Sequence, residues 1–178
     1  MAGSRRDERA WIRGAQGGSA SDLEALFRHH WPRAYRAAYL VVHDAGAAED
    51  IAQEAFLAAV RSLDRFDRRR PFGPWLHRIV VNRAIDWSRG RALRREVGDA
   101  PLGIVAASEP PDNPHSRTLA SALAELSPEH RAVIVLRHLL DYTPGEIAEL
   151  LGLPRGTVNS RLRRGLDELA GRIEEDVK

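Results

Sequence analysis

The chain has 178 residues, of which 43% are hydrophobic, 29% are charged and only 6% are aromatic. This length suits one ordinary domain or two small ones. No apolar run reaches the roughly 18 residues that a membrane-spanning helix needs, so membrane insertion is not expected. The first residues lack the apolar core of a secretory signal, and we expect a cytoplasmic protein. The absence of cysteine excludes disulfide scaffolds, thiolate metal sites and cysteine nucleophiles.

The formal net charge of +2 conceals a strong segregation of charge along the chain. Residues 61–95 contain eleven Arg and three Asp, a net charge of +8, and residues 155–166 contain four Arg and no acid, a net charge of +4. Residues 41–60 and 96–116 each contain four acidic residues and no basic one. Such basic blocks favour nucleic-acid phosphates as partners.

Helical periodicity dominates the N-terminal half of the chain. Ser21 is expected to cap a helix that runs to about Val42, and Pro32 predicts a kink or break near His30. An Arg-rich loop is predicted at residues 64–71. The segments expected to be helical are residues 4–15, 21–42, 47–63 and 72–93.

Residues 96–116 read as a flexible, acidic, Pro-rich linker, so the predicted domains are residues 1–95 and 117–178. In the second domain, Pro114 and Ser127-Pro128 each begin a helix. Thr143 and Glu146 form a predicted capping box, and Gly152 ends that short helix. We predict no strand. The expected fold is therefore all-α, with two small helical domains, the second of which contains a helix-turn-helix.

The helix predicted over residues 155–173 follows the short helix after a turn that contains glycine, as in DNA-binding helix-turn-helix motifs. On a helical wheel its apolar side consists of Val158, Leu162, Leu166, Leu169 and Ile173. The opposite side carries small polar residues and arginine, which can approach the major groove. The alternative is an ordinary amphipathic surface helix with solvated arginines.

The basic block of the first domain mixes arginine with aromatic residues, a composition typical of single-strand nucleic-acid sites. Three arginines of the predicted loop lie beside Phe66, Phe72 and Trp75. In the following helix, Arg78, Asn82, Asp86 and Arg89 form a polar stripe. The alternative is that the aromatic residues belong to the core, which we favour for Trp87.

The acidic helix before this block carries Asp50, Gln53, Glu54 and Leu57 on the side opposite its apolar stripe. An exposed leucine bordered by carboxylates is typical of a protein-binding face. Without further context, a solvated helix face explains it better.

Three segments in this order resemble the extracytoplasmic-function (ECF) sigma factors of bacterial RNA polymerase. They are GAAEDIAQEAFLAAVRSLDRFD, PFGPWLHRIVVNRAIDWSR and LSPEHRAVIVLRHLLDYTPGEIAELLGLPRGTVNSRLRRGLDEL. The resemblance covers roughly residues 20–93 and 117–170. It implies a transcription initiation factor that binds core RNA polymerase at its clamp and flap regions, and promoter DNA both as duplex and as melted non-template strand.

The resemblance also assigns residues to these partners. Asp50, Gln53, Glu54 and Leu57 would meet the polymerase clamp. The melted minus-10 strand would contact Asp67, Arg68, Arg69, Arg70, Arg78, Asn82, Asp86 and Arg89, and the minus-35 duplex would contact Arg155, Thr157, Asn159, Ser160, Arg161 and Arg164. Asn159 stands where the family often has a basic residue. An anti-sigma factor is a further expected partner.

Two other classes of protein compete with this interpretation. A stand-alone helix-turn-helix transcriptional regulator would use the second domain similarly, but it leaves residues 47–93 without a role. An enzyme is not expected, because the seven histidines show no metal-binding spacing and no phosphate loop or nucleophile elbow occurs. We expect neither a cofactor nor a metal.

Overall fold

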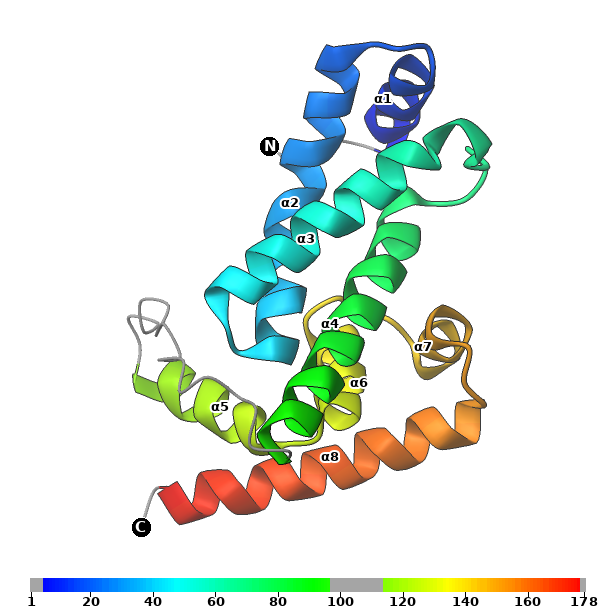
Figure 1. The fold of residues 1–178 in the computed structure, drawn as a ribbon. Helices are drawn as coiled ribbons and strands as arrows, with labels where there is room; N and C mark the ends of the chain where they lie inside the picture. Colours follow the sequence, from blue (N-terminus) through cyan, green and yellow to red (C-terminus); the bar gives the residue numbers. More distant parts are fainter. Residues whose placement is uncertain (1–4, 97–113, 177–178) are drawn as a thin grey trace.

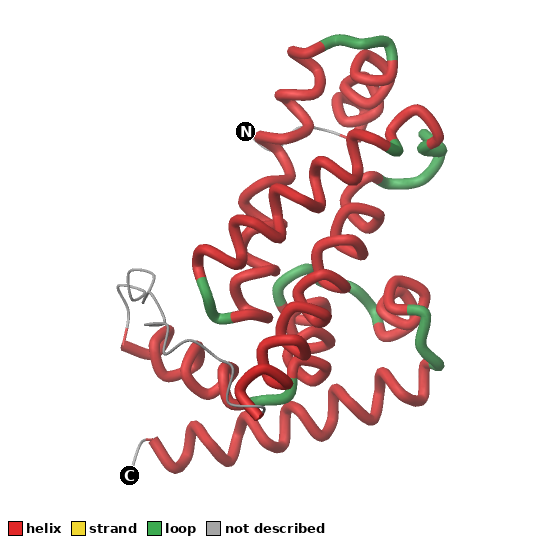
Figure 2. The backbone as a smooth tube through the Cα atoms, in the orientation of Figure 1, coloured by secondary structure: helices red, strands yellow, loops and turns green. Residues whose placement is uncertain are grey.

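The computed structural model describes residues 5–96 and 114–176, and these residues form helices joined by short loops, without any strand (Figures 1 and 2). This confirms the all-α class. The elements are α1 (Arg5–Gln16), α2 (Ala20–Val42), α3 (Ala45–Arg61), the 3-10 turn η1 (Leu63–Arg65), α4 (Phe72–Glu96), α5 (Pro114–Glu125), α6 (Pro128–His138), α7 (Pro144–Leu151) and α8 (Arg155–Asp176).

In the first unit, α2, α3 and α4 pack against one another and α1 covers one end of α2 (Figure 1). Many contact positions are alanine, and a small side chain allows helix axes to approach closely. The alanines with no exposed surface are Ala34, Ala37, Ala38, Ala48, Ala52, Ala55 and Ala84. Larger residues such as Leu26, Leu76 and Val80 fill the space between them and are equally buried.

Helix α2 departs from the sequence-based prediction at two places. Its N-cap is Ser19, whose Oγ accepts a hydrogen bond from the Asp22 backbone N–H, and Ser21 lies inside the first turn. The helix also continues through Pro32, so the expected break near His30 is absent. Packing of α2 against α1, α3 and α4 accounts for this, because tertiary burial outweighs the roughly 3 kcal/mol cost of an internal proline.

The second unit follows its local sequence signals closely. Ser127 caps α6, and Thr143 and Glu146 form the predicted capping box at the start of α7. Gly152 ends α7 with a left-handed φ of 66°, a conformation that glycine adopts without strain. Helices α7 and α8 thus form the predicted helix-turn-helix.

Helix α8 is a long bar that underlies the second unit and packs against α5, α6 and α7 (Figure 1). Gly165 allows the close crossing with α6, since a Cβ at this position would lie 3.1 Å from the Cβ of His130. His130 Nδ1 is 3.0 Å from Glu168 Oε2, and Arg172 forms an ion pair with Glu125 of α5. The C-terminal half of α8 is therefore fastened to both neighbouring helices.

The two units also pack against each other, which the sequence analysis did not anticipate. Helix α6 contacts α2 and α4, and α7 contacts α4. Tyr142, in the turn before α7, places its hydroxyl 2.8 Å from Nδ1 of the buried His77 on α4. Residues 97–113 of the predicted linker lie outside the described residues, whereas Glu96 ends α4 and residues 114–116 already belong to α5. The predicted domain boundaries remain a prediction.

Candidate protein and nucleic-acid interfaces

Helix α3 presents the acidic face that the sequence predicts. Asp50, Gln53, Glu54 and Leu57 are all exposed, and Leu57 keeps 55% of its surface accessible. Glu54 forms an ion pair with Arg83 of α4 at 2.5 Å, which fixes its carboxylate at the edge of this face. The four side chains therefore share one accessible surface, with acidic and apolar character side by side.

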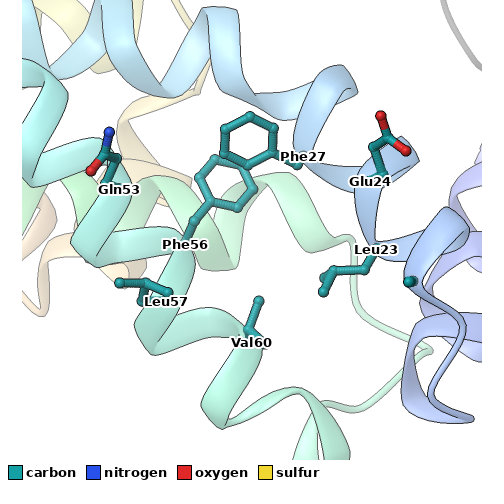
Figure 3. A pocket seen from close by; sticks show the side chains of 8 residues that line it. Leu23, Glu24, Phe27, Gln53, Phe56, Leu57 and Val60 are labelled. Carbon is teal, nitrogen blue, oxygen red and sulfur yellow. The ribbon is translucent and has the colours of Figure 1, made fainter.

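An apolar groove adjoins this face, between the N-terminal half of α2 and the C-terminal half of α3 (Figure 3). Its volume is about 510 Å³, and Phe27 and Val60 on its walls are each 39% exposed. The Phe27 ring stacks on Trp31 at 4.8 Å and tilts against Phe56 at 5.0 Å, which holds the groove open. The groove is lined by Ala20, Leu23, Glu24, Phe27, Gln53, Phe56, Leu57 and Val60.

The sequence does not reveal this groove, because Phe27 and Val60 lie on the apolar stripes of their own helices and each is nevertheless 39% exposed. Both stripes are wider than the surface that neighbouring helices cover. A contiguous exposed apolar patch of this kind is typical of a protein interaction site. The signal for the groove in the sequence is Leu57, an apolar residue predicted to be exposed. Phe27 and Val60, which line the groove with it, carry no such signal.

The Arg-rich loop lies between η1 and α4, where Arg68, Arg69 and Arg70 are exposed. Asp67 organises this loop from within: its Oδ1 accepts from the Arg69 N–H and its carbonyl accepts from the Arg70 N–H, both at 2.9 Å. The arginine side chains thus project from a turn whose backbone is fixed by hydrogen bonds.

The polar stripe of α4 begins next to this loop and runs toward the second unit. Arg78, Asp86 and Arg89 are exposed and Asn82 is half-buried. Arg89 Nε donates to Glu129 Oε1 of α6 at 2.7 Å. Although burial alone would raise the pKa of Glu129, the hydrogen bond and positive charge of Arg89 lower it. One end of the stripe is therefore engaged by the second unit.

The other end of the stripe also faces the second unit. Arg78 lines a pocket of about 480 Å³ together with Glu146 and Glu149 of α7. The pocket thus places two carboxylates of the second unit near one end of the stripe, while Arg78 and Arg89 both stay exposed.

Buried polar groups lie between the two units. Burial lowers the pKa of His77 to about 4 and that of His43 to about 4, so both rings are neutral at pH 7. Burial also lowers the pKa of Arg131 to about 10 and raises that of Tyr142 above its ordinary value of 10.0. The interface between the units therefore holds one buried cation, Arg131, which is 8% exposed.

The first three turns of α8 carry the predicted DNA-facing residues. Arg155, Asn159 and Arg164 are exposed, whereas Thr157, Ser160 and Arg161 are half-buried. The Ser160 hydroxyl donates to the Thr157 carbonyl at 2.9 Å, so it is engaged within the helix. All six residues belong to the end of α8 that follows the turn after α7.

The apolar side of α8 is narrower than predicted. Val158, Leu162 and Leu169 are buried, with exposed fractions of 0%, 9% and 8%. Leu166 lies on the same side of the helix but keeps 39% of its surface exposed. Buried Gly165 instead makes the contact with α6 at this level.

Within residues 5–96 and 114–176, no three His, Asp or Glu side chains come together as a metal site. Nor does any helix in these ranges combine the length and apolarity that crossing a membrane requires.

Family models define the class of protein to which these two units belong. A model of sigma-70 region 2 matches residues 26–94, and a model of sigma-70 region 4 matches residues 116–169. The chain is 33% identical over 171 residues to the ECF RNA polymerase sigma factor SigL of Mycobacterium tuberculosis, a match that covers 93% of this chain and 97% of SigL. It therefore belongs to the ECF sigma factors, as its motifs predict.

Solved structures agree with this assignment. CnrH in complex with the cytosolic domain of CnrY has a TM-score of 0.71 and 29% identity, and the match covers 96% of this chain and 99% of CnrH. RpoE in complex with the anti-sigma factor NepR from Bartonella quintana has a TM-score of 0.73, and the match covers 87% of this chain and 98% of RpoE. At 24% sequence identity, this match shows a likeness of fold alone. The protein is thus a non-enzymatic initiation factor that binds core RNA polymerase and recognises promoters through regions 2 and 4.

Proposed function

We propose that α3 and the adjoining groove form the surface that docks on the clamp of core RNA polymerase. The observation that carries this proposal is the continuity of two features: Gln53 and Leu57, which belong to the exposed acidic face of α3, also line the apolar groove. An apolar centre with a charged rim is the usual anatomy of a protein interface. Because Phe27 and Val60 line the same groove as Gln53, we propose that they also contact the clamp.

The loop at residues 67–71 and the α4 stripe are proposed to hold the melted non-template strand of the minus-10 element. Exposed arginines supply phosphate contacts, and Phe66, Phe72 and Trp75 support the loop from below. The proposed contacts are Asp67, Arg68, Arg69, Arg70, Arg78, Asn82, Asp86 and Arg89.

The start of α8 is proposed to read the minus-35 duplex. The exposed guanidinium of Arg164 can reach a base edge, while Arg155 and the backbone N–H groups near Thr157 can take a phosphate at the positive end of the helix. Asn159, Ser160 and Arg161 complete the proposed contact surface. The second unit, proposed as residues 117–178, would lie near the polymerase flap.

Use of both DNA surfaces at once requires the two units to separate, because Glu129 and the carboxylates of α7 face the α4 stripe. We propose that residues 96–116 are a flexible acidic linker that permits this separation, and that the first domain comprises residues 1–95. An anti-sigma factor is proposed as a regulatory partner, the class of protein that RpoE binds in its complex with NepR. We expect the protein to act in the cytoplasm.

The test is run-off transcription with purified core polymerase, combined with a titration of core binding. The variant Asp50→Arg/Glu54→Arg should lose core affinity about tenfold or more and remain folded, with a small fall in melting temperature because the Glu54–Arg83 pair is lost. Arg61→Glu, a charge reversal at the exposed end of the same helix, is the matched control. Unchanged core affinity of the double variant would contradict the docking assignment.

A further inference from the structure

The last residue of α1 reaches across to the segment that leads into the Arg-rich loop. Gln16 Nε2 donates hydrogen bonds to the backbone carbonyls of Leu63 at 2.8 Å and Phe66 at 3.1 Å, 47 and 50 residues further along the chain. Both partners are carbonyl oxygens, which only accept, so the carboxamide nitrogen must be the atom that faces them. Both N–H groups of the Gln16 carboxamide thereby donate to the same turn, residues 63–66.

These two carbonyls mark the beginning and the end of η1. The Leu63 carbonyl also accepts from the Phe66 N–H at 2.9 Å, which closes the turn. Phe66 then leaves the turn with extended backbone, at φ −70° and ψ 126°, and Asp67 follows directly. Gln16 therefore holds the last peptide group before the loop begins.

The side chains at both ends of the loop are held by a separate contact. The Phe66 ring lies 4.7 Å from Trp75 and 5.7 Å from Phe72, measured between ring centroids. Phe72 is the first residue of α4. The aromatic contacts fix the positions of the loop ends, whereas the Gln16 hydrogen bonds fix the direction in which the backbone enters the loop.

We propose that Gln16 is a positioning residue for minus-10 recognition: it orients residues 67–71 so that their arginines meet the unwound strand, without itself touching DNA. The proposal rests on the proposed function of that loop. A binding site needs its side chains held within about 0.5 Å of the productive geometry by a supporting layer of contacts. A loop held only by its aromatic ends would sample several entry directions and would discriminate poorly between bases.

The experiment measures base discrimination by the holoenzyme on single-stranded non-template oligonucleotides that carry each of the four bases in turn across the minus-10 element. In Gln16→Met, the unbranched side chain keeps its length but loses both donors. We expect discrimination at the position read by the loop to fall about tenfold. Affinity for core polymerase and for the minus-35 duplex should stay unchanged. Ala10→Met places the same side chain at an exposed site of the same helix and is the matched control.

A donor-retaining variant separates positioning from a merely structural role. Gln16→Lys offers an ammonium donor of similar reach, so it should keep most of the discrimination even if Gln16→Met lowers the melting temperature. If Gln16→Lys discriminates as poorly as Gln16→Met, the hydrogen bonds do not orient the loop and the proposal is wrong.

The triple variant Arg68→Ala/Arg69→Ala/Arg70→Ala distinguishes failure of this inference from failure of the proposed function. Loss of discrimination in the triple variant together with full discrimination in Gln16→Met would overturn the role of Gln16 and leave the loop assignment intact. Unchanged affinity for the single strand together with full discrimination in the triple variant would overturn the loop assignment itself, and the positioning role with it.

Discussion

Reversing the charge of Arg89 should open the arrangement of the two units. Arg89 Nε lies 2.7 Å from Glu129 Oε1, and the Arg89 and Glu129 side chains are 57% and 23% exposed. Loss of a pair at such a half-exposed site costs about 1 kcal/mol. The glutamate in Arg89→Glu adds a like-charge repulsion of about 1 kcal/mol at 4 Å in a water-like medium. Together these terms shift the closed-to-open ratio by about 30-fold.

The sequence makes the measurement simple because it contains no cysteine. Cysteines introduced at exposed Ala10 of α1 and Ala170 of α8 give one label on each unit. Pulsed electron-spin distances between two such labels should form one main population in the parent protein. In Arg89→Glu a longer and broader population should grow about 30-fold relative to the main one.

The double variant Arg89→Glu/Glu129→Arg re-forms the pair with opposite polarity and should restore the main population. Arg61→Glu, which lies at the far end of α3, should leave the distances unchanged. An unaltered distance distribution in Arg89→Glu would refute the reasoning. A double variant as open as the single one would show that the pair itself is not what holds the units together.

Three further predictions follow from the recognition helix, the buried histidines and the α7 cap. Arg164→Ala should reduce the preference of the holoenzyme for the correct base pair at one position of the minus-35 element by about 1–3 kcal/mol of binding free energy, measured on promoters randomised across that element. An equal loss of affinity for every sequence would contradict a base-reading role. Because burial lowers the pKa of His43 and His77 from 6.5 to about 4, the unfolded state binds more protons than the folded state between these values. The free energy of unfolding, measured by chemical denaturation, should therefore fall as the pH falls from 6.5 to 4. It should fall less steeply in His77→Gln, and the same pH dependence in the variant and the parent protein would show that His77 is not involved. Thr143→Ala should destabilise the protein by about 1 kcal/mol through loss of the cap, Thr143→Ser should not, and equal melting temperatures for the two variants would contradict the capping role.

The elements that were predicted correctly are those whose signals are local. Ser127, Thr143 and Gly152 act within four residues of their own positions, so their side chains and conformations decide where α6 and α7 begin or end. The helix-turn-helix follows from them. Two serines compete at the start of α2, and the sequence alone does not distinguish Ser19 from Ser21 as the cap.

The features that were missed depend on contacts between distant segments. Phe27 and Val60 occupy apolar stripes of their own helices, and only the placement of neighbouring helices leaves them uncovered. The contact between Gln16 and the start of the loop joins residues 47 and 50 positions apart, which no periodicity reports. The packing of α6 and α7 on α4 is of the same kind.

Helix α8 has a mechanical consequence under the proposed function. Its 22 residues span about 33 Å, roughly one turn of duplex DNA. The exposed end would sit in the groove, while Gly165 and the Arg172–Glu125 pair fasten the other half to α6 and α5. A helix held in this way rotates as a rigid body, so a rotation imposed on α8 by the bound duplex is transmitted to α5, the helix that begins at Pro114. Binding of the upstream element by α8 would thereby also set the orientation of α5.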